Sequence, residues 1–101
     1  MNPYTFLKSI VEELGFTPKE EELRPEVFGS AWVIYATQSA QLRLVWDGKD
    51  GVGFLECRSH ATGKWEAISE IMTEGDVEGN PKNEKKIAKF RRAVEGFGPS
   101  L

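Results

Sequence analysis

The sequence lacks most of the residues on which catalytic and metal chemistry depends. Its 101 residues include one cysteine and one histidine, so an intramolecular disulfide is excluded and no repeated ligand spacing exists for a zinc site. The glycines match neither GxGxxG nor GxxxxGK[ST], the common phosphate-binding patterns. Cys57 and His60 lie close together in the chain, but no third group is placed to orient them. We therefore expect a non-enzymatic protein with no cofactor, metal site or catalytic residue.

Long apolar runs are also missing. No stretch approaches the roughly 18 apolar residues that a membrane span needs, and the longest candidate, residues 31–36, has the length of a strand. Residues 1–4 contain no basic side chain, so we expect no signal peptide. A lone cysteine suits a reducing compartment. These features predict a cytoplasmic protein that does not enter a membrane, and the length fits one domain over residues 1–101.

Apolar spacing indicates two helices with strands between them. Apolar side chains recur at intervals of three and four over residues 3–14, where Gly15 ends the pattern, and again over residues 81–97. The period changes to two over residues 30–36, 42–47 and 52–57. The Asp- and Gly-rich residues 47–51 predict a hairpin turn between the last two strands. Residues 65–68 begin a fourth strand that we expect to continue into a helical turn through Met72.

This order predicts an α+β fold with two layers. We expect an antiparallel meander sheet of three to four strands, with the N- and C-terminal helices packed on one face. Residues 17–26 contain two prolines and three consecutive glutamates, which favours a loop or an irregular edge strand. Trp32 and Tyr35 point to opposite sides of their strand, so both sheet faces need cover. Residues 16–28 are one cover for the second face, and a protein partner is the other.

The charge is distributed unevenly along the chain. The net charge is -3, yet residues 80–101 carry six basic and two acidic side chains. Basic side chains share one side of the second helix at Lys82, Lys85, Lys89 and Arg92. This stripe is either a solvated outer face or a contact for nucleic-acid phosphates. The acidic balance of the whole chain favours the solvated face.

Four features together resemble small bacterial immunity-type and uncharacterised single-domain α+β proteins. They are a helix ending in Leu14-Gly15-Phe16, the step Phe28-Gly29-Ser30, the strand of residues 42–47, and Trp65. The resemblance implies a non-enzymatic protein that binds and blocks a toxin or another partner, often through an acidic surface. It assigns no site residue.

Acidic and aromatic side chains outside the second helix suggest the leading hypothesis, a protein-binding module with a basic protein partner. Its candidate contact residues are Glu20, Glu21, Glu22, Trp32, Tyr35, Glu70, Glu74, Asp76 and Glu78. The alternative is a nucleic-acid-binding or regulatory domain that uses the basic stripe. The sequence leaves the oligomeric state open.

Overall fold

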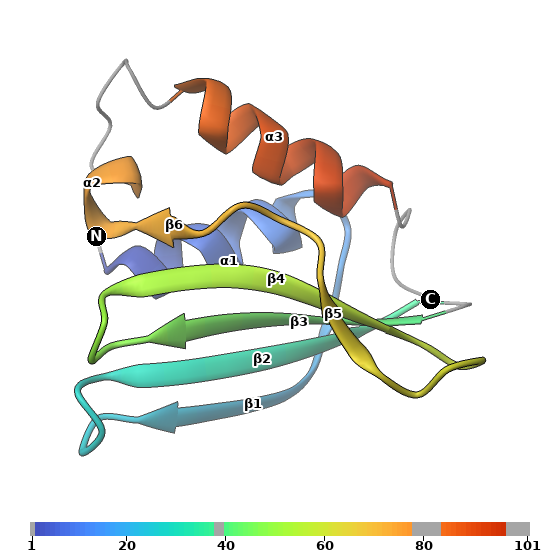
Figure 1. The fold of residues 1–101 in the computed structure, drawn as a ribbon, viewed down its shortest axis with the longest axis horizontal. Coiled ribbons are helices and arrows are strands. Elements are labelled where there is room, and N and C mark those ends of the chain that lie inside the picture. Colours follow the sequence, from blue (N-terminus) through green and yellow to red (C-terminus); the bar gives the residue numbers. More distant parts are fainter. Residues whose placement is uncertain (1, 38–39, 78–83, 97–101) are drawn as a thin grey trace.

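The first element is helix α1, Pro3–Glu13, in a computed structural model that describes residues 2–37, 40–77 and 84–96 (Figure 1). The Asn2 side chain caps the helix, because its Oδ1 accepts hydrogen bonds from the backbone N–H of Tyr4 (2.8 Å) and Thr5 (3.3 Å). Gly15 follows the helix with φ +98°, a conformation that only glycine adopts freely. The helix predicted over residues 3–14 is confirmed.

Within the described ranges, six antiparallel strands follow α1, and five of them form a meander. The strands are β1 (Pro18–Arg24), β2 (Ser30–Ala36), β3 (Ala40–Asp47), β4 (Val52–Ser59), β5 (Trp65–Ala67) and β6 (Met72–Thr73). Their order is β1-β2-β3-β4-β5, and β6 also pairs with β4. Strand β5 pairs with one end of β4 and β6 with the other. Two short strands therefore share the edge of β4 that faces away from β3. On the other side, β1 is the edge strand of the sheet.

The α+β class is confirmed, and the expected number of strands is too low. The irregular edge strand considered for residues 17–26 is confirmed, because residues 18–24 form β1 at the sheet edge, with a register shift between Pro18 and Glu20. Residues 16–28 are therefore not a loop that covers the second sheet face. The helical turn expected through Met72 is also wrong. The Ile68 N–H donates to the Leu55 carbonyl (2.9 Å) and the Ser69 hydroxyl accepts from the Leu55 N–H (2.9 Å), so this segment lies beside β4 and forms no helical turn. Helix α2, Glu74–Val77, begins only after β6.

The hydrophobic core lies between one face of the sheet and the helices α1 and α3 (Glu84–Glu95), which Figure 1 shows on the same side. Alternate residues of β2, β3 and β4 point into it, with Val33, Leu44 and Leu55 fully buried. Helix α3 adds Phe90 and Val94. Residues 81–83 and 97, where we expect that helix to begin and end, lie outside the described residues.

The β1–β2 turn and the β3–β4 turn pack against each other at one end of the sheet. The β3–β4 turn forms as predicted, since Asp47 Oδ1 accepts hydrogen bonds from the N–H groups of Lys49 (3.0 Å) and Asp50 (3.2 Å). The β1–β2 turn packs directly on it: a Cβ atom added to Gly48 would lie 1.9 Å from the Phe28 carbonyl oxygen. The Gly48 N–H also donates to the Ser30 hydroxyl (3.0 Å). The backbones of the two turns therefore approach as closely as a glycine permits.

Candidate protein-binding surface

Strand β1 divides its three consecutive glutamates between the two faces of the sheet. The register places Glu20 opposite Ile34 and Glu22 opposite Trp32, on the face away from the helices. Glu21 is opposite Val33 and faces the helices. Because successive side chains of a strand point to opposite faces, the three neighbouring carboxylates do not lie together, and each has different surroundings.

Glu21 is held by helix α1. The Tyr4 hydroxyl donates to Glu21 Oε2 at 2.5 Å, and Lys8 Nζ lies 3.0 Å from the same oxygen. Partial burial raises the pKa of Glu21, but the hydrogen bonds from Tyr4 and Lys8 outweigh it and lower the pKa overall. Burial and the acceptor carboxylate raise the pKa of Tyr4 far above its ordinary value. Glu21 therefore stabilises the contact between α1 and β1.

Tyr35 is fully buried, so its expected place on an exposed aromatic surface is wrong. Its side chain lies in the core, and its hydroxyl donates to Glu12 Oε2 of α1 at 2.8 Å. Burial, followed by this hydrogen bond, raises the pKa of Tyr35 strongly. The phenol can be deeply buried without a large free-energy cost because its hydroxyl has a carboxylate partner at the rim of the core.

The sheet face opposite the helices carries rows of cross-strand neighbours. One row runs from Glu22 through Trp32 and Val45 to Phe54, one residue from each of the first four strands. We call Trp32, Val45 and Phe54 the outer row. All three are partly exposed, and none belongs to the hydrophobic core. No helix among the described residues covers this row.

The acidic end of the outer row is held in place by hydrogen bonds. Trp32 Nε1–H donates to Glu22 Oε2 at 3.1 Å, and Arg24 Nε lies 2.7 Å from the same oxygen. The hydrogen bond from Arg24 lowers the pKa of Glu22. Glu20 has no ion-pair partner among the described residues. The indole of Trp32 is thus fixed beside an acidic strand edge, which is the arrangement of an aromatic anchor with an acidic rim.

Two arginines contact Trp65 on the outer face, near β5. Trp65 lies between Arg43, whose guanidinium carbon is 4.1 Å from the ring centre, and Arg58, at 4.8 Å. Arg43 also pairs with Glu56 at 2.7 Å, and Arg58 donates to the Gln41 side chain. Both arginines thus have polar partners and stack on Trp65, so neither presents an unpaired charge on this part of the outer face.

Exposed apolar side chains concentrate on the β1–β2 hairpin. Leu23 is 62% exposed, Val27 40% and Phe28 70%. Phe28 also has φ +55°, which is unusual for a bulky residue and costs about 1 kcal/mol. The sequence does not mark these residues as contact candidates, apart from the position of Phe28 before Gly29 in a turn. A shallow hollow of about 380 Å³ lies beside the hairpin, between α1 and β1, with Tyr4 and Lys8 in its lining.

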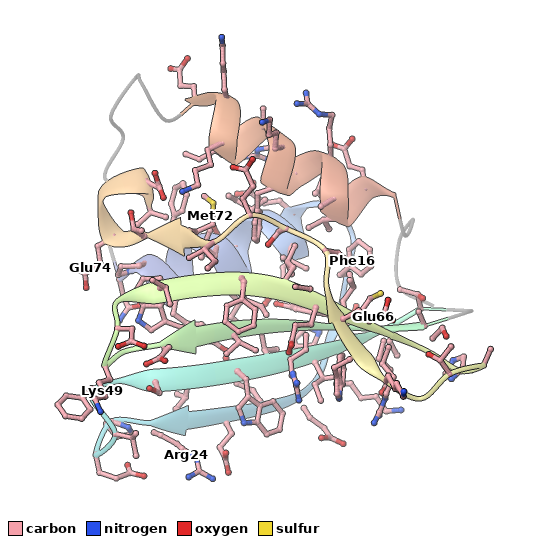
Figure 2. The ribbon with its side chains drawn as sticks, in the orientation of Figure 1. Phe16, Arg24, Lys49, Glu66, Met72 and Glu74 are labelled. Atoms are coloured by element: carbon pink, nitrogen blue, oxygen red, sulfur yellow. The ribbon has the colours of Figure 1, made fainter. Side chains whose placement is uncertain are left out.

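The remaining acidic candidates do not join this surface. Glu70 pairs with Lys89 of α3 at 3.3 Å, and Glu74 is exposed at the start of α2. Figure 2 shows Arg24 at the β1 edge and Glu74 beside α2, on the helix side. Glu78 lies outside the described residues. The single acidic surface expected from the sequence is therefore divided between two separate parts of the molecule.

Asp76 is a buried structural residue. It is 6% exposed, and its Oδ2 accepts hydrogen bonds from the Thr73 N–H (2.8 Å), the Thr73 hydroxyl (3.0 Å) and Lys86 Nζ (2.8 Å). Burial raises the pKa of Asp76, but the hydrogen bonds from Lys86 and Thr73 outweigh it and lower the pKa. The carboxylate ties α2 to α3, so it is not available to a partner.

The basic stripe of the alternative hypothesis is only partly free. Lys85 and Arg92 are exposed on α3, Lys89 pairs with Glu70, and Lys82 lies outside the described residues. Two other basic residues of this helix also have acidic neighbours: Lys86 pairs with Asp76, and Arg91 lies 3.9 Å from Glu13. Acidic side chains therefore flank the stripe, which weakens its attraction for phosphates.

The structure places Cys57 and His60, the two residues weighed for catalysis, on β4 and in the turn that follows it. Cys57 is half-buried on β4, where burial and the nearby Glu66 raise its pKa and so disfavour the reactive thiolate. His60 is exposed in the following turn. Within the ranges 2–37, 40–77 and 84–96, no group of three potential ligands is placed to hold a metal ion. None of the helices in those ranges is long and apolar enough to cross a bilayer.

Comparison with protein-family models, with curated proteins and with solved structures finds no match for this chain.

Proposed function

We propose that this protein is a non-enzymatic binding module that holds a basic protein partner against the outer row and the adjoining β1 edge. The observation that carries the proposal is the uncovered row Trp32, Val45 and Phe54 with Glu22 at its end. Partly exposed aromatic side chains on a rigid sheet supply binding energy at low conformational cost. Acidic side chains at the rim speed the encounter with a basic partner and select against acidic ones.

The resemblance of the sequence to immunity-type proteins suggests what this protein does to the partner that it binds. Immunity-type proteins bind a toxin and block it, and a preformed surface without a catalytic group suits such a role. The cytoplasmic location expected from the sequence stays a prediction.

A retention experiment tests the binding function. Immobilised protein is exposed to nuclease-treated lysate from its native source, and retained proteins are identified by mass spectrometry. We expect a basic protein to be retained by the natural chain and lost with Trp32→Ala. Glu74→Lys is the matched control, because it changes an exposed residue away from the outer row. Circular dichroism checks that both variants fold. Equal retention by Trp32→Ala would contradict the proposed surface.

Nucleic-acid binding through α3 is the second candidate function. Its support is the exposure of Lys85 and Arg92 on a helix that packs against the core through Phe90. Capture that disappears after nuclease treatment, and after replacement of Lys85, Lys89 and Arg92 with glutamate, would favour it. Protein retention that survives both changes would favour the outer row.

A further inference from the structure

We propose that β1 accepts an extended segment of the partner as an additional strand, and that this segment alternates basic and apolar side chains. The inference rests on the proposed function and specifies how the partner is held. It joins three observations: an open sheet edge, a hollow on its inner side and, on its outer side, Glu20 without an ion-pair partner among the described residues.

The open edge supplies the backbone contacts. Residues 20–24 of β1 continue in register with β2, after an irregularity between Pro18 and Glu20. Among the strands of the described residues, only β2 is a neighbour of β1 in the sheet. In an antiparallel pair, alternate N–H and C=O groups of an edge strand point away from its neighbour. These groups can pair with an extended peptide, which is the mode of binding known as strand addition.

The opposite side of the sheet does not offer the same opportunity. The far edge of β4 is occupied by β5 at one end and by β6 at the other. β5 itself has 3 residues, against 7 in β1. An added strand would therefore gain few hydrogen bonds there.

The inner side of β1 favours apolar side chains in the added strand. The hollow of about 380 Å³ between α1 and β1 is lined by Tyr4, Lys8, Glu21, Leu23 and Ala31, among others. Leu23 is largely exposed at its rim. The charge of Glu21 is already matched by Lys8 and its hydrogen bond from Tyr4. A residue pointing inward from the added strand thus meets apolar surface and a neutralised carboxylate.

The outer side favours basic side chains. Glu20 has no ion-pair partner in the described part of the chain, and Glu22 has only the exposed contact with Arg24, apart from its hydrogen bond with Trp32. Lysine or arginine side chains beside these carboxylates gain favourable cross-strand pairs. A second copy of β1 would instead bring glutamates next to glutamates, which is unfavourable. The occupant is therefore a basic segment of another protein.

The test uses a labelled, capped peptide of alternating lysine and valine with the 7-residue length of β1. Fluorescence anisotropy with the whole protein should show saturable binding. Glu20→Lys combined with Glu22→Lys should weaken it about tenfold. Glu66→Lys, which makes one such charge change on β5, should leave it unchanged. A peptide with glycine in place of valine, and one with methylated backbone nitrogens, should not bind to the natural protein.

Amide hydrogen exchange separates strand addition from charge attraction alone. We expect the β1 amides that point away from β2 to exchange rapidly in the free protein and to gain protection when the peptide binds. Binding without this protection would overturn the inference, as would equal binding of the methylated peptide. Failure of the valine peptide to bind would also overturn it.

Two further outcomes separate this inference from the proposed function. Partner retention that depends on Trp32, together with failure of the peptide, rejects strand addition and leaves the binding module in place. Self-association of the free protein that is abolished by the Glu20 and Glu22 changes would identify a second copy as the occupant and reject the basic partner at this edge.

Discussion

The two faces of the sheet are built from the same strands but differ in almost every physical respect. On the helix side, Val33, Leu44 and Leu55 are fully buried, and no buried side-chain polar atom in the described ranges lacks a partner. On the outer side, Trp32 and Phe54 remain partly exposed beside charged residues. Burial on the helix side therefore holds the fold together, whereas the outer side leaves large side chains partly exposed.

The largest expected difference between the faces concerns two consecutive residues. Leu44→Ala removes a fully buried side chain and should lower the free energy of unfolding by about 3 kcal/mol. Val45→Ala removes a partly exposed side chain of the outer row and should cost less than about 1 kcal/mol. Urea denaturation followed by circular dichroism measures both. Equal losses would show that the outer face is as much a core as the inner one.

The second expected effect concerns the supported turns. Gly48→Ala places a Cβ against the Phe28 carbonyl and should lower the free energy of unfolding by about 2 kcal/mol, because backbone must move. Lys49→Ala, at an exposed neighbouring position, should change it by less than about 0.5 kcal/mol. The same urea titrations compare the two variants. If Gly48→Ala left stability unchanged, the turns would not be rigidly packed and the exposed Phe28 would not be held in one orientation.

The smallest expected effect is a pH dependence on the helix side. Asp76 has a folded pKa below its ordinary value of 3.8, so its contribution is present above that value and is lost as the pH falls through the folded pKa. Asp76→Asn should cost about 1 kcal/mol at neutral pH, and the difference from the natural protein should narrow as the pH falls below 3.8 and through the lower folded pKa.

Urea midpoints at neutral and acidic pH measure this effect. Glu70→Gln is the matched control, since it alters an exposed pair with Lys89 and should cost less than about 0.5 kcal/mol at either pH. A cost for Asp76→Asn that does not change with pH would mean that its ionised form is not favoured by folding.

The sequence predicts the elements that have a clear apolar period, but for residues 17–26 it leaves a loop and an irregular edge strand open. The strands around Val33, Leu44 and Leu55 show alternation, and the helices show spacings of three and four. β1 carries glutamates on both sides, so no hydrophobic pattern marks it as a strand. Its inner carboxylate is matched by Tyr4 and Lys8, from a helix distant in the chain. Such pairs are visible only after folding.

The candidate surface follows the same division. Trp32 could be placed on a face from the alternation alone, and Glu20 and Glu22 fall beside it because β1 pairs with β2. The sequence could not reveal that β1 and α2 lie in different parts of the molecule, so it grouped Glu22 with Glu74. It also could not show that Tyr35 would find Glu12 as a hydrogen-bond partner and stay inside.

The position of α3 in the chain has a consequence for synthesis on the ribosome. The five strands of the meander pair in chain order, so hairpins can form as soon as each strand emerges. Phe90 and Val94, which complete the core, are added only when the last described helix has been made. Until then helix α1 is in place, but the part of the inner face that α3 covers is exposed apolar surface. Whether the nascent chain avoids aggregation depends on how quickly α3 is synthesised and packs, or on a chaperone that shields the sheet.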